Sequence, residues 1–384
     1  MHVILQGILA GKAWFIAEHV PSYIRVYISS RMTTGDKVRK GASRMVKAAE
    51  KQRPWKNALY TYVDQYNQSK VEHGPGLREQ IVTDLDYLMK RAERQFRTHA
   101  WYAEREVTPL KSETRAKLQR ILRETEDDVV ADLRLHSVFF YEKRGVTHKE
   151  DIISRERLTV VRDGDSWVIV GIERLEDERH PLNEADMGQG EADSARPILS
   201  APLINYGVYA GGTHSRAGRY EREAAASYAD KWWESGNPEF ATFDVDCTNY
   251  ISQCLFAGKA PIHYTGKREA GWWYKGYVNS REWWSYSWAV SNAFARYLNT
   301  NTSGLRADMV ERPEQLMLGD VIVYDWDGDG AFQHSTIVTA FDAGGMPLVN
   351  AHTVSSRHRY WDYRDSYAWN ENTVYRFYHI PDYF

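Results

Sequence analysis

Cysteine is scarce in this chain, which has two among 384 residues, Cys247 and Cys254. Two cysteines cannot build a disulfide scaffold. They also lie seven positions apart in a segment with helical spacing, which separates their Cα atoms by ~10 Å. That exceeds the ~7 Å limit for a bridge. We therefore expect two free thiols.

Long hydrophobic runs are also missing. Without a stretch of eighteen apolar residues, we expect no membrane-spanning helix. Residues 3–10 resemble the core of a signal peptide, but no basic segment precedes them and Lys12 interrupts the run, so we expect no signal peptide. The formal charge of -3 gives no reason to expect nucleic acid as a partner. The compartment and the oligomeric state stay open.

Metal-ligand spacings such as H-E-x-x-H do not occur, and we expect no cofactor. Two metal interpretations stay open as alternatives. Asp325, Asp327, Asp329 and Gly330 follow the first half of a calcium loop, although a glycine-rich turn is the preferred interpretation because position twelve would be Thr336. A zinc hydrolase using Cys247, His334 and His352 is also conceivable.

The length of the chain, with 43% hydrophobic and 26% charged residues, predicts a folded protein of two domains. We expect an α+β fold with these segments: a basic N-terminal segment, 1–53; a smaller α+β domain, 54–180; a linker, 181–208; and a second domain, 209–384. Within the first domain, helical spacing precedes alternating spacing. It predicts helices near 54–66, 77–105 and 112–123, then strands near 129–141, 152–161 and 167–175.

Residues 244–258 are the most informative stretch of the second domain. An acidic, extended entry precedes a helix, and Gly258 supplies its C-terminal stop. Cys247 falls in the first turn, where free N–H groups and the positive end of the helix dipole favour thiolate. Cys254 falls mid-helix on the apolar stripe, and we expect it to pack in the core.

Three short strands joined by glycine turns follow, over 318–324, 334–340 and 347–353. A thiol nucleophile needs an imidazole to accept its proton, and the imidazole needs a partner that orients it. His334 begins the middle strand. Asn350 and His352 share one face of the next strand, because side chains repeat every second residue.

These segments carry a resemblance to a known family. Residues 246–255, 318–322, 334–339 and 347–353 resemble the "putative amidase domain" family of Bacillus-type bacteria. That family is similar to the NlpC/P60 and CHAP groups of papain-like cysteine hydrolases. The resemblance covers about residues 209–380. The preceding half resembles the helix-then-sheet region that often comes before this domain.

The resemblance implies a papain-like catalytic domain, with the cysteine helix packed on an antiparallel sheet, that hydrolyses amide bonds, usually in bacterial cell-wall peptides. It implies Cys247 as nucleophile, His334 as general base and Asn350 as third member, with His352 as competitor. A cell-wall or extracellular location would follow from that substrate.

Other assignments are less direct. The backbone N–H of Cys247, with Asp246 in support, is the expected oxyanion site, since Ala241 stands where papain carries a glutamine. Trp273 and Trp288, from an aromatic-rich stretch, are candidates for lining a substrate groove. The rival hypothesis from another class is a non-catalytic wall-binding or scaffold module with a vestigial site.

Overall fold

The computed structural model describes residues 26–29, 53–72, 80–179, 218–278 and 281–384. The signal-like segment 3–10, most of the basic segment and the predicted linker 181–208 lie outside these ranges. Within them, no helix combines the length and apolar character needed to cross a membrane.

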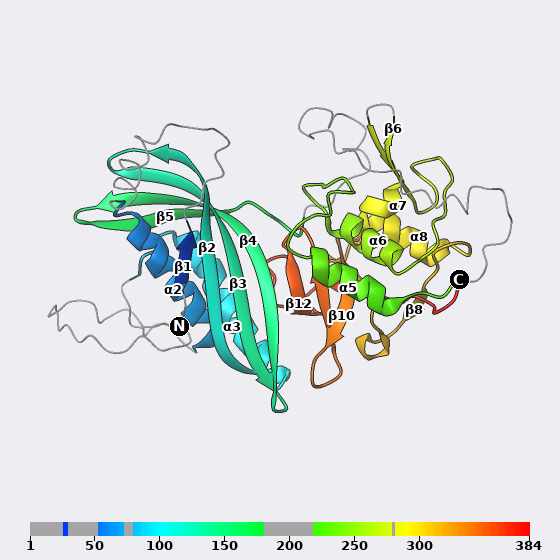
Figure 1. The fold of residues 1–384 in the computed structure, drawn as a ribbon. Coiled ribbons are helices and arrows are strands. Elements are labelled where there is room, and N and C mark those ends of the chain that lie inside the picture. Colours follow the sequence, from blue (N-terminus) through cyan, green and yellow to red (C-terminus); the bar gives the residue numbers. More distant parts are fainter. Residues whose placement is uncertain (1–25, 30–52, 73–79, 180–217, 279–280) are drawn as a thin grey trace, which may run out of the picture.

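The N-terminal half places two helices against a curved antiparallel sheet (Figure 1). Leu59, Tyr62 and Val63 of the first helix pack against Leu133, Leu158 and other apolar residues of the sheet. A short strand, β1, pairs in parallel with β2. The elements are β1 (Val26–Ser29), α2 (Lys56–Val71), α3 (Leu85–Glu104), β2 (Thr108–Glu124), β3 (Asp128–Lys143), β4 (Val146–Asp163) and β5 (Ser166–Arg174).

The helix predicted over 112–123 is wrong, because this segment forms most of strand β2. Its lysine, arginine, glutamate and leucine residues favour a helix when considered alone. In the structure Ser112, Thr114, Ala116 and Leu118 are buried at every second position, and the strand pairs with β3 along its length. Pairing and burial on one face of the sheet therefore override local propensity.

The C-terminal half is a second mixture of helices and antiparallel strands, so the α+β class is confirmed. Its elements in chain order are α5 (Arg222–Trp232), α6 (Cys247–Ala257), β6 (Tyr274–Val278), β7 (Arg281–Trp284), α7 (Tyr286–Ala289), α8 (Ser291–Thr300), β8 (Asp308–Val310), the 3-10 helix η2 (Pro313–Gln315), β9 (Val321–Asp325), β10 (His334–Phe341), β11 (Pro347–Ala351), β12 (Ser356–Tyr360) and β13 (Val374–His379).

One sheet runs through both halves. Its order is β1-β2-β3-β4-β12-β11-β10-β9-β13-β8, with β5 also paired to β4. The junction is the short antiparallel pairing of β4 with β12, in which Ser356 lies opposite Ile152 and Arg357 opposite Asp151. The two halves are therefore joined by backbone hydrogen bonds in addition to side-chain contacts.

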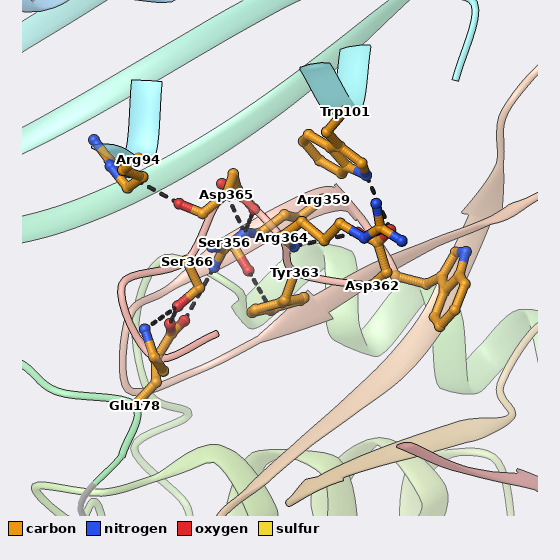
Figure 2. A network of polar contacts seen from close by, with 12 residues as sticks. Arg94, Trp101, Glu178, Ser356, Arg359, Asp362, Tyr363, Arg364, Asp365 and Ser366 are labelled. Carbon is orange, nitrogen blue, oxygen red and sulfur yellow. Dashed lines mark hydrogen bonds and ion pairs between the residues drawn. The ribbon is translucent and has the colours of Figure 1, made fainter. Parts of the chain in front are cut away.

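The two faces of the C-terminal strands have different covers. Helices α5 to α8 pack on the face that carries Val321, Val323 and Ile337. The opposite face carries Tyr324, Trp326 and Val338, which pack with Tyr363 and Ala368 of the loop after β12. That loop in turn meets α3, as Figure 2 shows for Trp101, whose Nε1 donates to Asp362 at 2.9 Å.

Candidate active site

Cys247 is the first residue of α6 and its side chain is only 2% exposed. The helix starts here because Asp246 adopts a non-helical conformation and its carbonyl accepts from Tyr250 N–H. The Asp246 carboxylate does not cap the helix by its side chain. The first-turn N–H groups have no partner within the helix, which leaves them available to an incoming oxygen.

Asp246 instead anchors the start of α6 to the sheet. One carboxylate oxygen accepts from Asn249 Nδ2 at 2.8 Å and from Phe243 N–H at 3.1 Å, and the other meets Nδ1 of His352 at 2.8 Å. The second ring nitrogen of His352 lies 2.8 Å from the carbonyl oxygen of Trp232. Each ring nitrogen of His352 therefore lies within hydrogen-bond distance of one oxygen atom.

A cluster of three buried hydroxyl groups lies beside the Cys247 sulfur. Ser291 Oγ is 2.7 Å from Thr248 Oγ1 and 2.9 Å from Ser335 Oγ, and the latter two are 3.1 Å apart. The sulfur lies 3.7 Å from Ser291 Oγ and 3.8 Å from Thr248 Oγ1. Sequence reasoning missed this cluster. Thr248 and Ser335 adjoin Cys247 and His334, but Ser291 comes from the start of α8 and carried no local signal.

His334 begins β10 and is fully buried. Its ring lies in an aromatic setting, with ring centroids 5.5 Å from Tyr324, 5.8 Å from Trp326 and 5.4 Å from Tyr363. Neither ring nitrogen makes a well-directed hydrogen bond to another described residue.

The structure brings Cys247 and His334 together, and this contact changes the thiol. Burial by itself raises the pKa of Cys247, but the nearby imidazole of His334, with smaller contributions from Ser291 and Thr248, outweighs it and lowers the pKa to about 7. A thiol with that pKa is substantially ionised at neutral pH. The arrangement is chemically suited to a nucleophile.

Asn350 is not brought to the His334 ring. Its Oδ1 accepts from Thr339 Oγ1 at 2.8 Å and from His358 N–H at 2.9 Å, and its Nδ2 donates to Asp230 of α5 at 2.9 Å. Asn350 lies opposite Ile337 across the β10–β11 pair, so it shares the helix-covered face. The rings around His334 belong to the other face. The expected third member is thus not in place here.

His352, the competitor for that role, does not contact His334 either. Its ring stacks on Tyr250 with centroids 3.9 Å apart, and its nitrogens bind Asp246 and the Trp232 carbonyl as described. Its position supports the cysteine helix from the sheet. In the described part of the chain, neither Asn350 nor His352 contacts the His334 imidazole, so neither of them orients it.

Trp273 and Trp288 do not line a groove, because each is only 1% exposed. The Trp288 ring lies 4.9 Å from Trp272 and 5.5 Å from Tyr274, and its Nε1 donates to Asn249 Oδ1 at 2.9 Å. Both tryptophans belong to the core that supports α6. Trp288 contacts the cysteine helix directly, and neither ring is open to a substrate.

The other thiol and the acidic loop also have clear positions. Cys254 is fully buried in the same core, as predicted, and burial raises its pKa well above the usual range.

The carboxylate of Asp325 accepts from the backbone N–H groups of Gly328, at 2.8 Å, and Gly330, also at 2.8 Å. That is the geometry of a closed turn. Over the described ranges, no group of three His, Cys, Asp or Glu side chains is placed to hold a metal ion.

One family model matches part of the C-terminal half. Residues 219–378 match a family model described as "Putative amidase domain". The chain is 50% identical over 167 residues to uncharacterized protein YhbB of Bacillus subtilis (strain 168), covering 44% of this chain and 52% of that protein. It is 30% identical over 132 residues to uncharacterized protein YjcM of the same organism, covering 32% of this chain and 28% of that protein.

The chain therefore spans about half, or less, of the curated relatives it matches. No solved structure matches it. The family match supports an amidase-domain family for the part of the chain that contains α5 to β13, and it suggests hydrolysis of amides at the coarse level of reaction class.

Proposed function

We propose that this protein is a cysteine-dependent amidase or peptidase with a papain-like arrangement, in which Cys247 is the nucleophile and His334 the general base. The observation that carries the proposal is the placement of Cys247 near His334 and beside the hydroxyl groups of Ser291 and Thr248, which lowers its pKa to about 7 against the opposing effect of burial. The position of this thiol at the start of α6 and the amidase-domain match over the same residues support it.

The proposed cycle begins when the Cys247 thiolate attacks the carbonyl carbon of an amide. The oxyanion accepts from backbone N–H groups in the first turn of α6. Protonated His334 donates its proton to the leaving amine, and the C–N bond breaks to give a thioester. Water, deprotonated by His334, then attacks the thioester, and the acid is released as the thiolate re-forms.

The proposed substrate class is a peptide of the bacterial cell wall. The experiment is mass spectrometry of purified peptidoglycan after incubation with the wild-type protein, Cys247→Ala and Cys254→Ser. We expect new amine-bearing fragments with the wild type, none with Cys247→Ala, and fragments again with Cys254→Ser, which serves as the matched thiol control. Full activity in Cys247→Ala would overturn the proposed mechanism.

One observation favours the non-catalytic alternative. Cys247 and His334 are 2% and 0% exposed, so a substrate reaches them only if the covering residues move. A wall-binding module with a vestigial site would bind peptidoglycan equally well as the wild type and as Cys247→Ala, and neither form would release an amine. The same experiment, with a pull-down of the protein on peptidoglycan, separates the two functions.

A further inference from the structure

The segment that follows β5 carries the N-terminal half into contact with the candidate active site. Its residue Glu178 is only 4% exposed, and its backbone carbonyl accepts from Nε1 of Trp326 at 2.8 Å. The next residue, Arg179, donates through Nε to the carbonyl oxygen of Ala368 at 3.0 Å. The N-terminal half therefore reaches one of the aromatic rings around His334 directly.

The side chain of Glu178 takes part in a buried group of ion pairs. One carboxylate oxygen lies 3.0 Å from Nη1 of Arg359, and the other accepts from Oγ of Ser366. Arg359 is 3% exposed and also binds Asp365 through Nε at 3.0 Å. Figure 2 shows Glu178 and Asp365 on either side of this guanidinium group. Two carboxylates thus fix the orientation of Arg359.

Arg359 in turn supports a second ring beside His334. Its guanidinium carbon lies 3.8 Å from the centre of the Tyr363 ring, and that ring lies 5.4 Å from the His334 ring. The backbone of Tyr363 has a φ of 57°, in the left-handed region that bulky residues rarely adopt. Such a conformation persists only where the surrounding contacts determine it. Arg359, together with the 3.0 Å contact between the Tyr363 hydroxyl and Ser356 Oγ, supplies those contacts.

Two of the three rings around His334 therefore depend on one residue of the N-terminal half. The Trp326 ring is inclined by 28° to the imidazole, with centroids 5.8 Å apart, and it is bound to the Glu178 carbonyl. The Tyr363 ring is reached through the guanidinium group. The third ring, that of Tyr324, belongs to β9. Because neither candidate for the third triad position contacts the imidazole, packing against these rings is what orients it.

We propose that Glu178 is a positioning residue for His334. Its backbone carbonyl fixes Trp326, its carboxylate fixes Tyr363 through the guanidinium group, and the two rings hold the imidazole near the Cys247 thiol. The N-terminal half would then have a part in the reaction beyond packing. This inference rests on the proposed roles of the cysteine and the histidine.

The pKa of Cys247 provides a measure of the imidazole position, because His334 makes the largest contribution that lowers it. The other titratable side chains packed against this imidazole are Tyr324 and Tyr363. Burial raises the pKa of both phenols above the usual range, so both stay neutral near pH 7. The charged side chains behind Tyr363 are those of Glu178, Arg359 and Asp365.

The test is the rate of Cys247 alkylation by iodoacetamide as a function of pH, with the full chain in a Cys254→Ser background. In Glu178→Gln we expect the midpoint to rise from about 7 by about one pH unit, which lowers the thiolate fraction at pH 7 about fivefold. Glu173→Gln is the matched control, because Glu173 pairs with Arg157 on the exposed surface of β5. It should leave the midpoint unchanged.

A second variant protects the result against a folding defect. Ser366→Ala removes the hydroxyl that binds one oxygen of Glu178 and keeps the charge, so we expect a smaller shift in the same direction. Circular dichroism verifies the fold of each variant. A wild-type midpoint in folded Glu178→Gln would overturn the proposal. If Glu178→Gln does not fold, a wild-type midpoint in Ser366→Ala would overturn it.

Alkylation needs no substrate, so this experiment and the peptidoglycan experiment can fail separately. A raised midpoint in Glu178→Gln, with no amine released from peptidoglycan by the wild type, would support the positioning role and reject the proposed hydrolysis. Amine release that requires Cys247, with the same midpoint in folded Glu178→Gln as in the wild type, would support the hydrolysis and reject the positioning role.

Discussion

At the scale of single residues, the environment of Cys247 separates two thiols that look similar in composition. Both are buried, and burial raises the pKa of each. Only Cys247 has an imidazole and hydroxyl groups beside it that reverse the effect. The consequence is a difference in reactivity at neutral pH that can be measured without knowing the substrate.

We predict that the alkylation rate of Cys247 by iodoacetamide rises with pH, passes its midpoint near the lowered pKa of about 7 and then levels off, because the thiol is deprotonated above that pKa. The measurement is mass spectrometry of the modified peptide in a Cys254→Ser background. His334→Gln should move the plateau toward higher pH, since it removes the largest contribution that lowers the pKa. A rate that continues to rise steeply through about pH 9, the range of an ordinary thiol, would contradict the assignment.

The hydroxyl cluster supplies a second test of the same pKa. Ser291→Ala removes the hydroxyl 3.7 Å from the sulfur, whereas Thr248 and Ser335 can still bond each other. We expect the alkylation plateau to move to higher pH by less than in His334→Gln, at a cost of about 1 kcal/mol in the free energy of unfolding. An unchanged pH profile of alkylation would mean that the hydroxyl cluster contributes to packing and does not lower the pKa of Cys247.

At the scale of elements, the cysteine helix depends on two supports from other segments. The aromatic core under Trp288 holds one side of α6, and the Asp246–His352 pair connects its first turn to the sheet after β11. This explains why Asn350 and His352 occupy neighbouring positions without contacting His334. Asn350 binds α5 and His352 binds the start of α6, so both side chains attach helices to one face of the sheet.

We predict that His352→Phe destabilises the protein by about 1–3 kcal/mol, because the buried carboxylate of Asp246 loses a donor. The phenyl ring can still stack on Tyr250, so the change isolates the hydrogen bonds. Denaturant unfolding measures the effect. His263→Phe, whose ring contacts Tyr297 in a less buried place, is the control and should cost less. Equal losses would contradict a special role for the Asp246–His352 pair.

At the scale of the whole molecule, the two halves share a sheet and a buried polar seam. Lys143 and Asp342 form an ion pair across it at 2.9 Å, with side chains 7% and 0% exposed. Trp101 and Tyr102 at the end of α3 pack with Leu348 and Tyr360 of the C-terminal strands. Removal of one half would expose both these apolar surfaces and the edge of β12.

We predict that Trp101→Ala lowers the free energy of unfolding of the full chain by about 3–5 kcal/mol, because it leaves a cavity at the seam. Phe96→Ala on the same helix should change it little, since Phe96 is 80% exposed. Both halves should unfold together in one transition, observed by circular dichroism and by tryptophan fluorescence. Two separate transitions, with only one shifted by Trp101→Ala, would show that the halves fold independently.

Local patterns in the sequence were sufficient for several features. Helical spacing and Gly258 located α6 and placed Cys247 at its start, and glycine turns located β9, β10 and β11. These features depend on residues close together in the chain, where periodicity and turn chemistry act directly. The class of the fold, α+β, followed from the same patterns.

Tertiary structure decided the rest, because it depends on contacts between residues far apart in the chain. Only the pairing with β3 made a strand of residues 112–123, and only packing in the aromatic core of the C-terminal half buried Trp273 and Trp288. The alternation of side chains along β11 predicts that Asn350 and His352 share one face of the sheet. It does not predict that the aromatic rings around His334 lie on the opposite face of the sheet. The hydroxyl beside Cys247 from Ser291 and the sheet that joins both halves also arise from long-range packing, which local sequence does not encode.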